Sequence, residues 1–184
     1  PPVEWSYEPT KGLFILAGAQ TDWFNDPAGK YAKDNAPCAL VTPPDDHFLL
    51  SAKVSVAFAS AFDAGTLQIR ATEDRWAKVC FEYSPQGRPM IVSVVTRGVS
   101  DDCNSVEIDR PEIYLRVART PQTLAFHYSR DGRVWHFVRY FSLGQCGSLR
   151  VGVSAQSPTG AKFAVVFSES GYRRGSRQDK PSGE

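Results

Sequence analysis

The sequence predicts an all-β domain folded as a two-sheet antiparallel sandwich. Aromatic residues make up 12% of the chain, and they favour strands. Apolar and polar residues alternate with a period of two in about nine separate runs, which is the pattern of half-buried strands. Turn-forming residues separate these runs at regular spacing, as in sandwiches and barrels. No segment has an apolar period of 3.6 residues over three turns, so we expect no substantial helix.

The first 47 residues are rich in proline, glycine, aspartate and asparagine, and they predict short strands joined by long loops. Within them, Trp23 and Phe24 place two large aromatic side chains in the polar, turn-forming segment 20–27. Two interpretations follow. The pair could cap one end of the hydrophobic core, or it could form a rim that stacks on a ligand.

The alternating runs begin at residue 48. In the first of them, Phe48, Ala52 and Val54 fall on one face, and Ser51 and Lys53 on the other. The predicted strands lie near residues 48–59, 64–71, 76–84, 90–97, 112–119, 123–129, 134–141, 149–156 and 162–168. Asp131-Gly132 separates two of these runs and is a strong hairpin signal.

We expect one sandwich domain over residues 1–170, because sandwiches of this size commonly form a single unit. The remaining segment, 171–184, has four basic and two acidic residues and predicts a disordered, basic tail that could alternatively act as a contact arm. The formal net charge of +1 gives no reason to expect a nucleic-acid or membrane partner. A homodimer through exposed sheet edges is compatible with the fold class.

The cysteine pattern favours a protein with free thiols. The four cysteines are too far apart in the sequence for a zinc knuckle or a redox pair: Cys38, Cys80, Cys103 and Cys146. We therefore expect a cytoplasmic protein. The scattered histidines form no metal triad, and no phosphate-binding glycine-rich loop or dinucleotide fingerprint is present, so we expect no metal and no cofactor. Cys80 could be a thiolate nucleophile, but an inert buried thiol is the simpler interpretation. Calcium at Asp45-Asp46 or Asp101-Asp102 is only weakly indicated.

The non-core faces of several runs carry a distinctive set of polar side chains. If these strands share one sheet, its outer face is rich in arginine, glutamine and histidine and has small residues that leave room for a ligand. The predicted face consists of Gln68, Arg70, Trp76, Lys78, Glu82, Thr96, Arg116, His127 and Gln156. It could be a ligand cleft, or it could be a set of solvated cross-strand charge pairs.

The chain resembles the regulation-of-enolase family, a domain of unknown function in the concanavalin A-like lectin/glucanase superfamily. The matching segments, in chain order, are Thr21–Phe24, Ala64–Arg70, Trp76–Glu82, Ser93–Asp101, Tyr114–Arg119, Tyr128–Trp135 and Val151–Pro158. The resemblance departs from the family pattern at Asp102 and Cys103, where family members tend to carry an aromatic residue. It implies a jelly-roll sandwich of the concanavalin A-like type with one concave sheet, the surface on which lectins and glucanases of this superfamily bind glycans.

Three hypotheses of function follow. The first is a binding module that holds a small carbohydrate or an acidic or phosphorylated metabolite on the concave sheet. Its candidate ligand-binding residues are Asp22, Trp23, Gln68, Arg70, Trp76, Thr96, Arg116 and Gln156. The second is an enzyme, either a lyase, isomerase or cyclase, with Lys78, Glu82 and His127 as acid–base catalysts, or a glycosidase with a pair of carboxylates. The third is a regulatory or scaffold protein without a small ligand.

Overall fold

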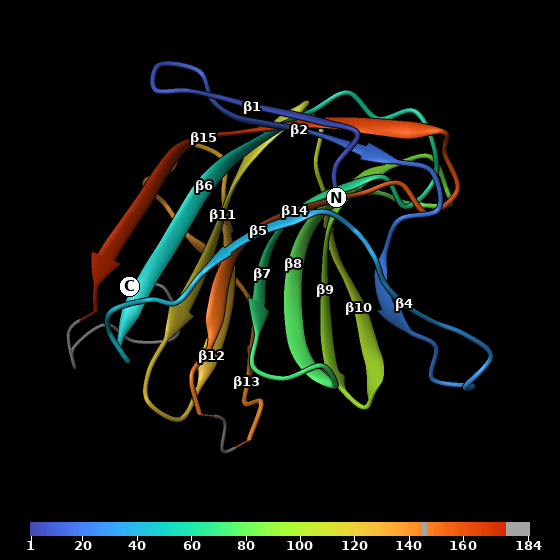
Figure 1. The fold of residues 1–184 in the computed structure, drawn as a ribbon. Coiled ribbons are helices and arrows are strands. Elements are labelled where there is room, and N and C mark those ends of the chain that lie inside the picture. The colour runs from blue at the N-terminus through green and yellow to red at the C-terminus, as the bar shows by residue number, and fades with distance from the viewer. Residues whose placement is uncertain (145–146, 176–184) are drawn as a thin grey trace.

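The structure, a computed structural model, describes residues 1–144 and 147–175. Within these residues all regular structure is β: fifteen strands and no helix. Two antiparallel sheets of seven and six strands face each other, and a two-stranded pair lies beside them (Figure 1). The predicted two-sheet antiparallel sandwich is confirmed. In the described part of the chain, no helix has the length and apolar character required to cross a membrane.

The seven-stranded sheet contains strands from both ends of the described chain and from its central part. Its strands, in spatial order, are β1 (Glu4–Glu8), β2 (Gly12–Gly18), β15 (Lys162–Arg174), β6 (Phe48–Val56), β11 (Glu112–Arg119), β12 (Leu124–Ser129) and β13 (His136–Phe141). Its central strand β6 pairs with β15 on one side and β11 on the other.

In the six-stranded sheet, four strands that are consecutive in the sequence lie side by side, and two strands from other parts of the chain follow them. In spatial order they are β10 (Val99–Glu107), β9 (Pro89–Arg97), β8 (Arg75–Tyr83), β7 (Ala64–Arg70), β14 (Arg150–Gln156) and β5 (Cys38–Val41). The short strands β3 (Trp23–Asn25) and β4 (Ala32–Asp34) pair only with each other. In Figure 1, β4 projects as a separate arm beside β10.

The hydrophobic core lies between the two sheets, and the period-two alternation explains its composition. On β6, Phe48, Ala52 and Val54 are buried, as the sequence predicts. Leu67 on β7 and Phe126 on β12 are fully buried and belong to the same cluster. Each strand therefore contributes one face to the core, and its other face is available for different chemistry.

Strand β10 is the clearest omission of the sequence prediction. The segment Val99–Glu107 pairs with β9 along most of its length, yet its sequence pattern does not predict a strand. Asp101, Asp102 and Asn104 are residue types that are depleted in strands. An edge strand tolerates them because one of its sides faces no neighbouring strand.

The C-terminal boundary also differs from the expected one. After an irregularity between Ser168 and Gly171, β15 resumes its pairing with β6 and continues to Arg174. The predicted start of the tail at residue 171 therefore falls inside a strand. The remainder of that prediction, residues 176–184, lies outside the described residues.

The hairpin predicted at Asp131-Gly132 joins β12 to β13, and its glycine allows a specific test. Gly132 has a φ of +73°, and an added Cβ would come within 3.1 Å of the Tyr114 ring. We expect Gly132→Ala to lower the free energy of unfolding by about 1–2 kcal/mol, measured by urea denaturation. Gly147→Ala is the control, because nothing lies within 4 Å of its added Cβ. Equal stability of the two variants would contradict this account of the turn.

Candidate functional site

The outer face of the six-stranded sheet brings together most of the polar residues selected from the sequence. Strand β8 contributes Lys78 and Glu82, and Lys78 lies opposite Gln68 on β7. Gln156 comes from the end of β14, two strands away from β8. Antiparallel register therefore gathers side chains that are up to 88 residues apart in the sequence, from Gln68 to Gln156.

Arg116 and His127 do not belong to this face, so their placement in the predicted site is wrong. They lie opposite each other on β11 and β12 of the seven-stranded sheet. There the Arg116 guanidinium stacks 4.3 Å from the centre of the Trp135 ring, and the His127 ring packs edge-on against Phe137. Alternation along a strand identifies the face of a side chain but not the sheet that contains the strand. The proposed Lys78–Glu82–His127 acid–base set is therefore not assembled.

A segment running through β3 and β4 covers part of the polar face. The indole of Trp23 packs edge-on against Trp76, with 5.9 Å between ring centroids, and its nitrogen donates a hydrogen bond to the carbonyl of Ala36. The Arg70 guanidinium lies 4.7 Å above the Trp23 ring. These contacts form a small second core with Val94, outside the main one.

Trp23 belongs to this cover, and three predicted ligand-binding residues on the sheet are buried as it is: Gln68, Trp76 and Thr96. The hydroxyl of Thr96 lies 2.8 Å from that of Ser100 on β10. Neither amide atom of Gln68 has a hydrogen-bond partner among the described residues. In this conformation these side chains support the wall of the site and do not contact a ligand directly. Sequence alternation cannot reveal such a covering segment.

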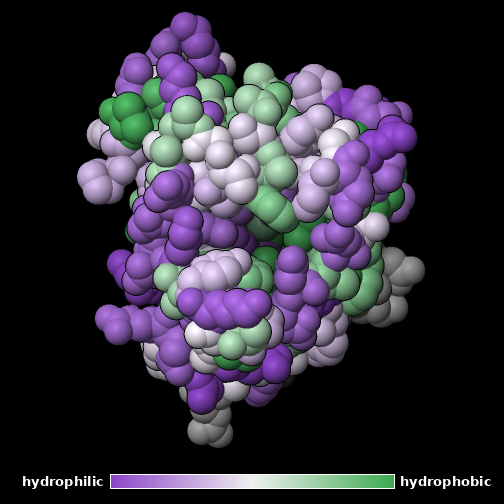
Figure 2. All heavy atoms as spheres, turned by 90° about the vertical axis from the view of Figure 1, so that its right-hand side faces the viewer, coloured by the Kyte–Doolittle hydropathy of each residue, from purple (hydrophilic) through white to green (hydrophobic). Residues whose placement is uncertain are grey.

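Beside the cover lies an open cleft of about 400 Å³. One side face of the molecule, where β4 and β10 lie in Figure 1, is hollowed near its centre, with hydrophilic and hydrophobic residues around the hollow (Figure 2). The residues that line the cleft are Asp22, Phe24, Tyr31, Lys33, Phe62, Lys78, Glu82, Val94, Asp102, Gln156, Pro158 and Thr159. Its volume is within the range of small-molecule sites.

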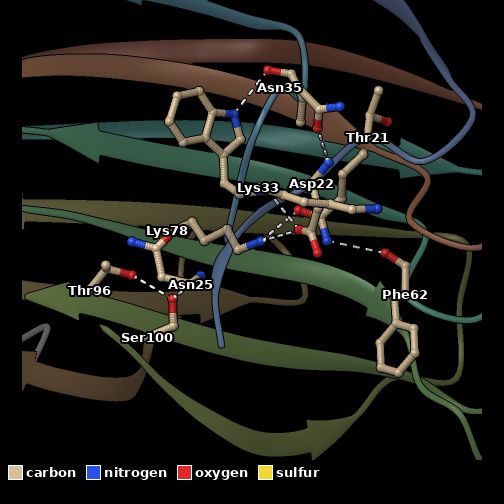
Figure 3. A network of polar contacts seen from close by, with 12 residues as sticks. Thr21, Asp22, Asn25, Lys33, Asn35, Phe62, Lys78, Thr96 and Ser100 are labelled. Carbon is tan, nitrogen blue, oxygen red and sulfur yellow. Dashed lines mark hydrogen bonds and ion pairs between the residues drawn. The ribbon is translucent and has the colours of Figure 1, made fainter. Parts of the chain in front are cut away.

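The Lys78 ammonium links the strands of the six-stranded sheet to the segment that precedes β3. It is 3.1 Å from the Asp22 carboxylate (Figure 3). It also donates a hydrogen bond of 2.6 Å to the side-chain oxygen of Gln156. The amide nitrogen of Gln156 in turn donates to the carbonyl of Phe62. The same Asp22 oxygen also accepts from the backbone N–H of Trp23. One buried cation thus connects β8, β14 and the segment that precedes β3.

The charged groups around Lys78 and Glu82 shift one another's pKa values. Burial lowers the pKa of Lys78, but the carboxylates of Asp22 and Glu82 and the thiol of Cys80 outweigh it, so the pKa lies above its ordinary value. Burial raises the pKa of Glu82 to about 8; Asp102 and Asp22 act in the same direction, and Lys78 opposes them. Lys78 is therefore charged at neutral pH, whereas Glu82 is largely protonated.

Cys80, between these two residues on β8, is an unsuitable nucleophile. It is fully buried, and burial raises the pKa of its thiol well above the ordinary value despite the nearby Lys78. A protonated thiol without access to solvent is unreactive. Cys38, Cys80 and Cys103 are all free thiols, as expected for those three; Cys146 lies outside the described residues.

The sequence-based site omitted an aromatic rim and one carboxylate. Phe24 and Tyr31 stand on the arm that carries β3 and β4, with 6.1 Å between their ring centroids. Phe62 borders the cleft from the loop before β7, and Asp102 from β10. The sequence predicts Phe24 as a possible rim residue, but it does not single out Tyr31 and Phe62, because isolated aromatic residues in loops are common.

Phe62 has an unusual backbone conformation at the edge of the site. Its φ of +69° lies in the left-handed region, which costs a non-glycine residue about 1–2 kcal/mol. The neighbouring Asp63 is fully buried and stabilises the loop by accepting hydrogen bonds from the backbone N–H of Ser60 and the hydroxyl of Ser157. Such local strain is concentrated at functional sites.

Solved structures with the same fold include proteins of different length. A functionally unknown protein from Saccharomyces cerevisiae is 23% identical, with 95% of this chain and 93% of that chain covered and a TM-score of 0.84. The GH43 protein BlXynB from Bacillus licheniformis is 18% identical, with 95% and 35% covered and a TM-score of 0.75. The alginate lyase from Klebsiella pneumoniae is 15% identical, with 72% and 61% covered and a TM-score of 0.52.

At these identities the similarity establishes the fold, which agrees with the jelly-roll sandwich expected from the sequence. The chain spans about a third of the length of the GH43 protein. No curated protein is matched by this sequence. The resemblance to the regulation-of-enolase family is not confirmed by these matches and stays a prediction. A family model described as "Protein of unknown function (DUF1349)" matches residues 1–174, and the chain therefore belongs to the DUF1349 family.

Proposed function

We propose that the cleft beside β8 binds a saccharide. The observation that carries this proposal is the combination of an aromatic rim with a floor of fixed hydrogen-bonding groups in a cleft of about 400 Å³. Phe24, Tyr31 and Phe62 offer flat apolar surfaces for the C–H faces of sugar rings. Glu82, Asp102 and Gln156 offer polar atoms for hydroxyl groups.

The distribution of cations supports a saccharide over the acidic or phosphorylated metabolite that was the other expectation. To hold such an anion, Arg70, Lys78 and Arg116 would have to form a positively charged cluster in the cleft. Arg116 is on the other sheet, Arg70 stacks on Trp23, and Lys78 is already paired with Asp22. Three carboxyl groups face the cleft together with Lys78 and Lys33, so it has no surplus of positive charge.

The fold comparisons are compatible with this proposal. Similar solved structures are described as a GH43 protein, a xylan beta-1,4-xylosidase and an alginate lyase, all of which act on carbohydrates. The xylosidase, from Bacillus halodurans, matches over 88% of this chain and 33% of its own chain. These neighbours support the class of ligand and leave its identity and the chemistry open.

Titration with oligosaccharides tests the proposal. We expect gluco- or xylo-oligosaccharides to bind in calorimetry and to raise the melting temperature, and Phe24→Ala and Tyr31→Ala to weaken binding about tenfold by removing stacking area. Tyr140→Ala is the matched control, since Tyr140 is as exposed as Tyr31, at 52%, but does not line the cleft. The proposal fails if no saccharide binds, or if all three variants bind equally well.

An enzyme at the same site is a second candidate, and Glu82 is the observation that favours it. A largely protonated carboxyl group in a cleft that also contains Asp22 and Asp102 is suited to act as a general acid. His127 is too far from this site to take part, and the raised pKa of Lys78 opposes its use as a base. Mass spectrometry of each binding mixture separates the candidates: a consumed ligand shows turnover, and an unchanged ligand shows binding alone.

A further inference from the structure

Two carboxyl groups in the cleft form no ion pair within the described part of the chain. Glu82 is only 8% exposed and lines the cleft, and its carboxyl group makes no hydrogen bond or ion pair with any residue in the ranges 1–144 and 147–175. Asp102 enters the cleft from β10 and likewise has no ion pair within the described chain. A nearly buried carboxyl group without a hydrogen-bond partner, such as that of Glu82, is costly, so its position beside an open cleft points to a partner from outside the protein.

The nearby cations are already engaged elsewhere. The Lys78 ammonium contacts Asp22 and Gln156, and Lys33 donates to the backbone carbonyl of Gln20. Arg139 pairs with Asp101, whose side chain lies on the opposite face of β10 from that of Asp102. Two carboxyl groups without an ion pair, those of Glu82 and Asp102, therefore face the cleft together with one ammonium group, that of Lys33, which among the described residues is hydrogen-bonded only to a neutral carbonyl.

We propose that the preferred ligand is an amino saccharide, a sugar with a free ammonium group that Glu82 and Asp102 bind together. This inference rests on the proposed saccharide-binding function and specifies its ligand class. Charge-assisted hydrogen bonds from an ammonium group to carboxylates are stronger than those between neutral groups. The aromatic rim of Phe24, Tyr31 and Phe62 adds to the attraction, because the faces of aromatic rings favour cations.

Binding of this ligand is coupled to the ionisation of Glu82. The groups around it are Lys78 and Cys80 on β8, Asp102 on β10, Asp22 before β3, Tyr31 before β4 and Lys33 on β4. Burial raises the pKa of Glu82 to about 8, so the empty site holds a proton at pH 6. An ammonium group requires the ionised carboxylate, so its binding at that pH releases about one proton from the protein.

Four disaccharides with the same β-1,4 linkage test the inference at pH 6, where a sugar amine with a pKa of about 8 is charged. They are the disaccharides of glucosamine, N-acetylglucosamine, glucose and glucuronic acid. We expect the glucosamine disaccharide to bind about tenfold more tightly than the acetylated and neutral ones. Calorimetry in two buffers with different ionisation enthalpies measures the released proton.

Glu82→Gln and Asp102→Asn remove the two carboxylates with little change in shape, and each should reduce the preference for the amino disaccharide. In Glu82→Gln the proton release should also disappear. Glu107→Gln, on the same strand as Asp102 but outside the cleft, is the control and should retain both properties. Equal binding of amino and neutral disaccharides, or preference for the uronic acid, overturns this inference and leaves the saccharide site standing. Absence of binding by all four overturns both.

Discussion

Lys78→Met is expected to lower the free energy of unfolding by about 3 kcal/mol, because it removes one partner of a buried ion pair. The Lys78 side chain is only 2% exposed, and it is the group that Asp22 and Gln156 contact together. Methionine preserves most of the side-chain volume, so the loss reports the missing charge. Chemical denaturation measures it, and Lys162→Met is the control because Lys162 is exposed at the start of β15.

A double-mutant cycle with Asp22→Asn separates pairing from packing. If Lys78 stabilises the fold through Asp22, the second substitution should cost less in the Lys78→Met background, with a coupling energy of about 1–3 kcal/mol. Additive losses would instead show that Lys78 contributes by filling space. The cycle also reports whether the segment before β3 is held to the sheet by this contact.

The stability of the wild-type protein is expected to fall, relative to Glu82→Gln, as the pH rises from about 5 to about 8. Burial raises the folded-state pKa of Glu82 from 4.5 to about 8, whereas in the unfolded chain the carboxyl ionises near its ordinary value. Between these values the folded state retains a proton that the unfolded state has released, so raising the pH favours unfolding. The pKa difference sets an upper bound of about 5 kcal/mol on the effect.

Urea denaturation of both proteins at pH 5 and pH 8.5 measures this difference. Glutamine cannot ionise, so the change in stability between the two pH values should be smaller in the variant than in the wild type. Glu107→Gln is the matched control and should follow the wild type, since Glu107 is exposed on β10. Parallel pH dependence in the wild type and Glu82→Gln would show that Glu82 ionises normally in the folded state.

Most of the architecture could be predicted from the sequence because period-two alternation reports burial directly. The runs from residue 48 onward correspond to strands, and Phe48, Ala52 and Val54 face the core as expected. Strand β10 was missed for a physical reason. Its pairing with β9 stabilises a sequence whose aspartate and asparagine residues disfavour strands in isolation.

The site was harder to predict, because it depends on which strands become neighbours. Lys78, Glu82 and Gln156 were selected correctly for one face, but Arg116 and His127 follow the same alternation in the other sheet. Pairing between distant strands is fixed by tertiary contacts, which a single strand's pattern does not encode. The aromatic rim was missed for a similar reason: Tyr31 and Phe62 lie in connecting segments, where only the folded chain shows their shared orientation toward the cleft.

Trp23 and Phe24 are neighbours on β3 but point to opposite sides of the strand, which bears on how the ligand specificity of the cleft could be altered. Trp23 is 3% exposed and anchors the segment to Trp76, whereas Phe24 borders the cleft. Attachment is thus carried mainly by Trp23, whereas Phe24 packs against the same small core but is only partly buried and borders the cleft. Libraries that randomise Phe24, Tyr31 and Phe62 while keeping Trp23 and Trp76 should yield mostly folded proteins. The cleft is in this sense a replaceable surface on a constant frame, and new specificities should be obtainable by selection without redesign of the sandwich.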